Sequence, residues 1–160
     1  MKRDIYDTRK EMQQEQLSAM NKLLASAKIN PFYKKRLSGD FGDGQFDHVK
    51  QISDAFPCLT KEEIAADHKE FPPFGTNLTL PIEEYNHFSQ TAGTTATPIR
   101  WLDDPEGWQW MMDNWVTVME QAGLKKSDRI MFAFSFGPFL GFWTAYDAAQ
   151  QMGLLVIPSG

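Results

Sequence analysis

The sequence has little cysteine, no excess of positive charge and no long hydrophobic run. Its single cysteine, Cys58, excludes a disulfide framework and a metal site built from paired cysteines. The formal net charge of −5 leaves no chain-wide basic field that would hold nucleic acid or an anionic membrane. A local anion site made by backbone amides needs no such field. The sequence therefore argues against nucleic-acid and membrane partners.

Targeting and membrane-spanning segments are lacking as well. Residues 1–10 are charged and contain no apolar core, so they do not form a secretory signal. The most apolar window, residues 130–140, is interrupted by Ser135, Gly137 and Pro138, and it is shorter than the roughly 20 residues that cross a bilayer. The sequence thus predicts a cytoplasmic protein.

The composition that remains is that of a globular protein. The chain has 160 residues, of which 42% are hydrophobic and 23% charged, enough for one domain or two small lobes. Two parts are expected: a mostly helical lobe over residues 1–80, and an α/β segment over residues 81–160. Aromatic residues reach 13% and crowd into the second part.

The first part carries helix signals. Thr60 and Glu63 have the spacing of a capping box, in which each side chain binds the exposed backbone N–H of the other residue. Residues 71–75, with two prolines and a glycine, are expected to form an extended linker between the lobes. The helices predicted here span residues 7–28, 32–37 and 60–69.

The second part alternates between strand and helix patterns. A helix begins at Asp104, with Pro105 at its first position, and its apolar stripe runs from Trp108 to Ala122. The stripe indicates packing, and its extra face, Trp110 and Val118, is expected to meet another subunit or the remainder of the protein. Strands are predicted over residues 86–91, 98–102, 129–134 and 154–157, with a helix over 139–152. A strand, a crossover helix and a strand predict a parallel sheet. The expected fold class is therefore α/β: a helical N-terminal lobe followed by the start of a parallel, helix-flanked sheet.

The segment between the first two strands is the most informative one. Residues 91–98 (TAGTTATP) form a hydroxyl-rich loop with one glycine, and such a loop can turn several backbone N–H groups toward one anion. It is not a Walker loop, because the Gly-Lys-Ser/Thr ending is absent. Residue chemistry alone leaves two readings open, a phosphate site and a plain β-turn with surface threonines.

The loop resembles the phosphate-binding signature of the adenylate-forming superfamily, since Thr91, Gly93, Thr94, Thr95 and Pro98 stand where that pattern requires them. Other segments are similar, in order and spacing, to one branch, the phenylacetate–CoA ligases. The resemblance covers about residues 15–160 and implies a partial adenylate-forming N-terminal domain. The similar segments are residues 30–36 (NPFYKKR), 56–63 (FPCLTKEE), 74–75 (FG), 128–130 (DRI), 134–143 (FSFGPFLGFW) and 154–158 (LLVIP).

The resemblance implies a two-step reaction. A carboxylic acid attacks ATP in the presence of Mg²⁺ and gives an acyl-adenylate and pyrophosphate, and coenzyme A then takes the acyl group. The ATP phosphates would be held by the loop residues, and a strand-to-helix turn would wall the acyl pocket. These residues are Thr91, Gly93, Thr94, Thr95 and Thr97 for the phosphates, and Phe136, Gly137 and Pro138 for the acyl group. No catalytic residue can be named, and no protein metal site is expected, because His48, His68 and His87 are scattered.

Two departures from the signature favour a different class of function. Ala96 and Thr97 stand where the motif has glycine and lysine. Alanine adopts a positive φ only with strain, and a threonine hydroxyl gives a neutral hydrogen bond in place of a charge-assisted one. The alternative is a non-catalytic binding or assembly protein that reuses the fold. A nucleotide-binding module unrelated to ligases is disfavoured by the missing Walker ending.

The last residues lead to the expectation of a truncated chain. Residues 154–157 read as an internal strand of a parallel sheet, which needs covered faces and paired edges. The adenine pocket and the mobile C-terminal domain with the family's catalytic lysine would lie in a missing C-terminal part, so these 160 residues alone are expected to be inactive. The aromatics near Phe136 point to an aryl, phenylacetate-like acid, although core packing explains them equally. The oligomeric state is left open, with a homodimer expected from base rates alone.

Overall fold

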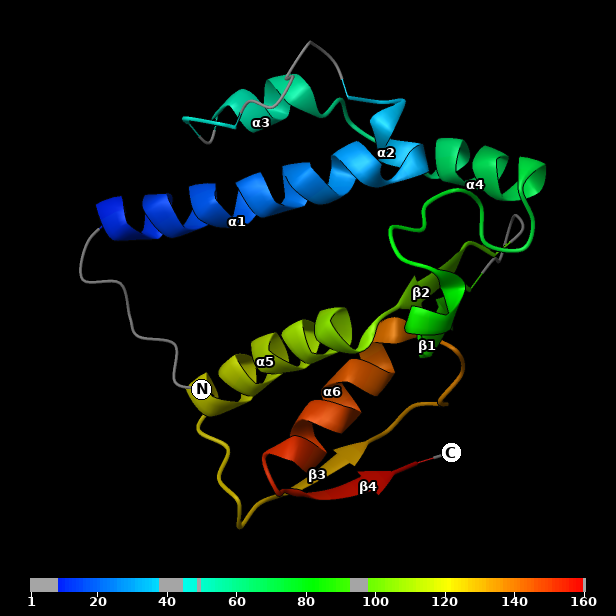
Figure 1. Ribbon diagram of the computed structural model, residues 1–160. Coiled ribbons are helices and arrows are strands. Elements are labelled where there is room, and N and C mark those ends of the chain that lie inside the picture. The colour runs from blue at the N-terminus through cyan, green and yellow to red at the C-terminus, as the bar shows by residue number, and fades with distance from the viewer. Residues whose placement is uncertain (1–8, 38–44, 49, 93–97, 160) are drawn as a thin grey trace. The chain divides into compact units, whose positions relative to one another are not determined.

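The computed structural model describes residues 9–37, 45–48, 50–92 and 98–159, and it divides into two compact units, residues 1–79 and 80–160 (Figure 1). Helices make up the first unit, and helices with paired strands make up the second, so the chain has the α/β class expected from its sequence. Two short elements, α3 and η1, were not predicted. The elements are α1 (Arg9–Ile29), α2 (Pro31–Lys34), α3 (Lys50–Ala55), α4 (Lys61–Glu70), η1 (Ile82–Glu84), β1 (His87–Gln90), β2 (Arg100–Asp103), α5 (Pro105–Gln121), β3 (Arg129–Phe132), α6 (Leu140–Gln151) and β4 (Leu155–Pro158).

The corner between α1 and α2 is built on Asn30, whose side chain is only 3% exposed. Its Oδ1 accepts hydrogen bonds from the backbone N–H groups of Phe32 (3.0 Å) and Tyr33 (3.1 Å), which caps α2. Its Nδ2 donates to Asn77 Oδ1 (3.1 Å) and to Thr79 Oγ1 (2.9 Å). One buried amide therefore ties the helical corner to the end of the same unit.

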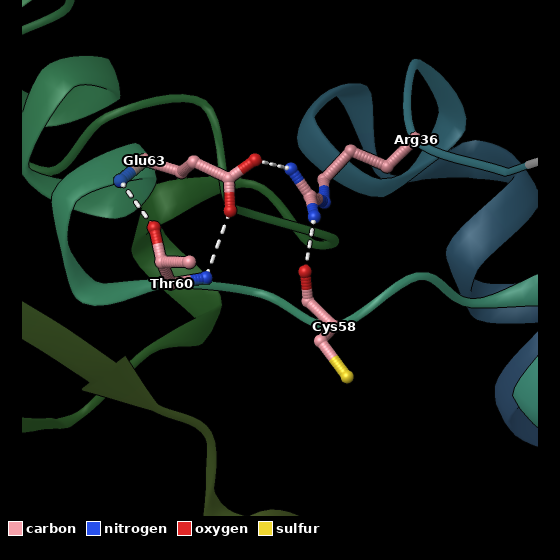
Figure 2. Close-up of polar contacts among 4 residues, drawn as sticks. All are labelled: Arg36, Cys58, Thr60 and Glu63. Carbon is pink, nitrogen blue, oxygen red and sulfur yellow. Dashed lines mark hydrogen bonds and ion pairs between the residues drawn. The ribbon is translucent and has the colours of Figure 1, made fainter.

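The start of α4 has the capping box that the sequence predicts (Figure 2). Thr60 Oγ1 accepts from the Glu63 N–H at 3.3 Å, and Glu63 Oε2 accepts from the Thr60 N–H at 2.8 Å. Arg36 pairs with the other oxygen of Glu63 and also donates to the Cys58 carbonyl at 3.0 Å. The Thr60 N–H, and then the Arg36 guanidinium, lower the pKa of Glu63 because they bind its charged form.

Residues 71–75 form a turn, so the prediction of an extended linker here is wrong. The Gly75 N–H donates to the Phe71 carbonyl at 2.7 Å, and Gly75 has a φ of +72° that only glycine adopts at low cost. The chain then folds back on α4, because the Thr76 N–H and hydroxyl donate to the Asp67 carboxylate at 2.6 and 2.7 Å. A partner nine residues away closes the turn.

The second unit contains two strand pairs. β1 and β2 are antiparallel, with His87 opposite Asp103 and Gln90 opposite Arg100. β3 and β4 are parallel and are joined through α6, which confirms the predicted strand–helix–strand unit. Figure 1 shows α6 alongside β3 and β4. β3 ends at Phe132, two residues earlier than predicted, because the chain then enters the turn that precedes α6.

One face of the β3–β4 pair packs on the helices and the other is open. The inner face belongs to a core of Met119, Phe132, Ala145, Ala149 and Leu154. The outer face carries Met131 and Leu155, which are 61% and 57% exposed, together with the exposed Ile157. The stripe of α5 is likewise divided, because Trp108 and Met119 are buried whereas Trp110 is 62% exposed. Among the described residues, no helix has both the length and the apolarity needed to cross a membrane.

Candidate functional site

The predicted phosphate loop is described only at its two ends. Gly93, Thr94, Thr95, Ala96 and Thr97 lie outside the described residues, so their roles stay predictions. The ends are closed by Thr91 and Ile99. The Thr91 N–H donates to the Ile99 carbonyl at 2.9 Å, and the Ile99 N–H donates to Thr91 Oγ1 at 3.0 Å. The loop therefore rises from a closed base at the ends of β1 and β2.

Thr91 is both a structural residue and a candidate donor. Its hydroxyl oxygen accepts the Ile99 N–H, and the hydroxyl keeps its own hydrogen, which can be donated to an anion. The donor chemistry of this residue thus fits a phosphate oxygen. The geometry assigns it the additional task of holding the loop ends together.

The turn over residues 135–139 is the second predicted part of the site. The Gly137 carbonyl accepts two hydrogen bonds, from the Phe139 N–H at 2.7 Å and from Trp143 Nε1 at 2.9 Å. A Cβ atom at Gly137 would lie 2.6 Å from a carbon of the Phe139 ring, which is too close for any side chain. The turn is therefore held in one shape by Trp143 from α6 and by the absence of a side chain at Gly137.

A backbone hydrogen bond brings the two predicted parts together. Because Thr91 and Ile99 form a hydrogen-bonded pair, the next pair, Gln90 and Arg100, is of the non-hydrogen-bonded kind, and the Gln90 N–H points away from β2. It donates to the Pro138 carbonyl at 2.7 Å. The base of the phosphate loop and the proposed acyl turn are thus direct neighbours within residues 80–160.

Phe136 belongs to an aromatic cluster. Its ring lies edge to face or tilted against four others, with centroid separations of 4.8 to 6.2 Å. The half-buried ring packs against the core of the unit, which explains its presence without a ligand. Contact with an acyl group stays a prediction for this residue. The four rings belong to Phe132, Phe134, Trp143 and Tyr146.

The far end of the β1–β2 hairpin carries charge. The His87 ring stacks on Trp108 with centroids 3.9 Å apart and planes 9° apart, and Trp108 Nε1 donates to Asp147 at 3.0 Å. Asp103 lies opposite His87, and its Oδ2 is buried without a hydrogen-bond partner among the described residues. Burial raises the pKa of Asp103, His87 opposes that effect, and the neighbouring Asp104 adds to it.

The buried carboxylate at position 103 predicts a pH dependence of stability. Its pKa is raised in the folded state, so between its ordinary value and the raised one the folded chain holds more protons than the unfolded chain. Stability should therefore fall as the pH rises through this window. Asp103→Asn should remove that fall and raise stability at neutral pH, as measured by urea unfolding at a series of pH values. Asp113→Asn, at an exposed carboxylate on α5, is the control for the loss of one charge. An unchanged pH profile for Asp103→Asn would contradict the assignment.

Sequence reasoning did not find Gln90, Trp143 or Asp103. The alternation of N–H directions along β1 was a usable signal for Gln90, but its partner lies 48 residues later and no local pattern points to it. Trp143 was interpreted as core, whereas it is exposed and its indole N–H holds the turn. No group of three or more His, Cys, Asp or Glu residues in the described parts of the chain could hold a metal ion.

Comparison with known proteins identifies the fold. No protein-family model matches the sequence, and no curated protein matches it significantly. An open conformation of 2-hydroxyisobutyryl-CoA ligase in complex with 2-HIB-AMP and CoA aligns with a TM-score of 0.85 and 20% identity, over 96% of this chain and 36% of its own. The same ligase in its thioesterification state gives 0.86 and 22%, over 96% and 33%. The chain thus has the fold of part of an adenylate-forming ligase and spans about a third of the length of these structures.

Proposed function

We propose that this chain forms the part of an ATP-dependent acid–CoA ligase that holds the polyphosphate and contacts the acyl group. The observation that carries the proposal is the hydrogen bond between the Gln90 N–H and the Pro138 carbonyl. It sets the closed base of a hydroxyl-rich loop beside an aromatic turn. A reaction between a carboxylate and the α-phosphate of ATP requires these two neighbours.

The chemistry explains why the loop has its composition. Pyrophosphate leaves with growing negative charge, so fixed N–H and hydroxyl donors must face it before reaction begins. Thr91, Thr94 and Thr95, with the Gly93 amide, would supply neutral donors, and Thr97 would add one where the family signature has a cation. Mg²⁺ would accompany the nucleotide, since it keeps water and phosphate ligands and requires few protein carboxylates.

The acid and the thiol are finer parts of the proposal. The fold likeness to a ligase whose structure holds an acyl-adenylate and CoA supports coenzyme A as the acceptor. The aromatic turn at Phe136 supports an aryl acid, and the similar segments place the chain nearest the phenylacetate–CoA ligases. A short hydroxy acid, of the kind named in the neighbouring structures, is the competing substrate class.

A second function is favoured by Ala96 and Thr97. Without the lysine cation and the flexible glycine of the motif, the loop would bind polyphosphate less tightly, because neutral hydrogen bonds are about half as strong as charge-assisted ones. The chain would then be a binding or assembly protein with the ligase fold. This reading predicts that an acid or a nucleotide binds without any exchange reaction.

ATP–pyrophosphate exchange tests the proposal. The protein produced from the natural reading frame is incubated with ATP, labelled pyrophosphate and one acid at a time, from a panel of aryl acids and short hydroxy acids. Acid-dependent incorporation of label into ATP is the expected result. ATP and acid binding are measured in parallel by calorimetry, so that binding without exchange identifies the non-catalytic function. A protein that neither binds nor exchanges would contradict both.

A further inference from the structure

We propose that the turn over residues 135–139 and the phosphate loop are coupled through one hydrogen-bonded strap, and that Trp143 is the positioning residue that sets it. The strap runs from Trp143 through Gly137 and Pro138 to Gln90 and Thr91. Binding of the acid at the turn would then change the affinity of the loop for the nucleotide. This inference rests on the proposed function of the same site.

The first link fixes the turn to α6. Trp143 Nε1 donates to the Gly137 carbonyl at 2.9 Å, and the Trp143 ring meets Phe136 edge to face at 4.8 Å. The indole therefore holds both the backbone of the turn and the side chain expected to contact the acyl group. A shift of Phe136 on ligand binding would move the Trp143 ring, and with it the carbonyl that the indole holds.

The second link joins the turn to the loop. Pro138 directly follows Gly137, and its carbonyl accepts the Gln90 N–H at 2.7 Å. Gln90 directly precedes Thr91, whose backbone and hydroxyl close the loop on Ile99 at 2.9 and 3.0 Å. No flexible side chain lies between the turn and the loop base. A displacement of the turn is therefore passed to Thr91 through backbone atoms, which transmit movement better than long side chains do.

The strap has little slack at its centre. A side chain at Gly137 would lie 2.6 Å from the Phe139 ring, so the turn is packed against its own aromatic residue. The Gln90 N–H is on the edge of β1 that does not pair with β2, so its bond to Pro138 is separate from the ladder. The bond can consequently be removed without breaking the hairpin.

The test uses two variants that break the strap at different links. Trp143→Phe removes the indole N–H and keeps an aromatic ring against Phe136. Gln90→Pro removes the N–H that reaches Pro138, at an edge position where proline is tolerated. Trp115→Phe is the matched control, because Trp115 Nε1 donates to Thr144 on α6 at 3.1 Å and touches no part of the strap. Gln90→Ala keeps the N–H and is the second control.

The measurement is the ratio of dissociation constants for a non-reactive ATP analogue without and with a saturating acid. A coupled site should give a ratio of about five or more. Trp143→Phe and Gln90→Pro should each lower it toward about one and raise KM for the acid, whereas the two controls should keep the wild-type ratio. Circular dichroism melting establishes that each variant is folded.

The outcomes separate the inference from the proposed function. Exchange activity with a wild-type ratio near one, or with a ratio that both strap variants leave unchanged, overturns the coupling and leaves the ligase function standing. Absence of exchange with every acid of the panel overturns the two together. A ratio that falls equally in Trp115→Phe would show a general effect of α6 and would also reject Trp143 as the positioning residue.

Discussion

Thr94→Ala is expected to slow acid-dependent ATP–pyrophosphate exchange by about 100- to 1,000-fold, the typical effect of removing one donor that faces a developing negative charge. The loop offers neutral donors alone, because Thr97 stands where the family motif has lysine. Each hydroxyl is therefore expected to matter more than it would beside a cation. Thr95→Ala should have an effect of similar size if its hydroxyl faces the same group.

The pattern of kinetic constants distinguishes this role from simple binding. A donor that acts on the departing pyrophosphate lowers kcat and kcat/KM together, whereas a donor that holds ground-state ATP raises KM and leaves kcat unchanged. Thr117→Ala is the matched control, because its hydroxyl donates to the Asp113 carbonyl within α5, away from the loop. Exchange rates in Thr94→Ala and Thr95→Ala equal to those of the control would remove the loop from the mechanism.

Asn30→Ala is expected to destabilise the unit of residues 1–79 by about 3 kcal/mol, which combines the loss of a helix cap with buried groups left without partners. The side chain makes four hydrogen bonds, two to the first turn of α2 and two to Asn77 and Thr79. Alanine replaces none of them. Urea unfolding followed by circular dichroism would measure the loss as a lower midpoint with an unchanged slope.

Asn77→Ala supplies the comparison for this prediction. It removes the same side-chain type but only one of the bonds to Asn30, and the α2 cap stays intact. It should therefore cost about 1 kcal/mol. Equal losses in the two variants would mean that Asn30 contributes through its link to Asn77 alone and that the cap of α2 adds nothing.

Elements with local signals were predicted well. The capping box of Thr60 and Glu63 and the Asp104–Pro105 helix start both involve residues within four positions of each other, so the sequence displays the interaction itself. The β3–α6–β4 unit was predicted from alternating patterns and short connections, because few topologies are compatible with that order.

Features that depend on distant partners were missed. Asn30 was interpreted as the end of a helix, since its partners Asn77 and Thr79 lie 47 and 49 residues away. The turn at Gly75 was predicted as extended, because nothing near it reveals that Asp67 captures Thr76. The link between Gln90 and Pro138 joins two segments that the sequence marked separately and for different reasons. The family resemblance suggested what each segment does, and the folded chain adds that they are adjacent.

The open face of β3 and β4 has a consequence for the behaviour of the chain in solution. Met131, Leu155 and Ile157 present oily rows to water on strands whose opposite side is filled. Two such surfaces that meet exclude water from both, a gain that is mostly entropic near room temperature and therefore grows on warming. Any preparation in which this surface stays bare would turn cloudy sooner as it is concentrated or heated, and it would stay clear longer once a covering layer is present.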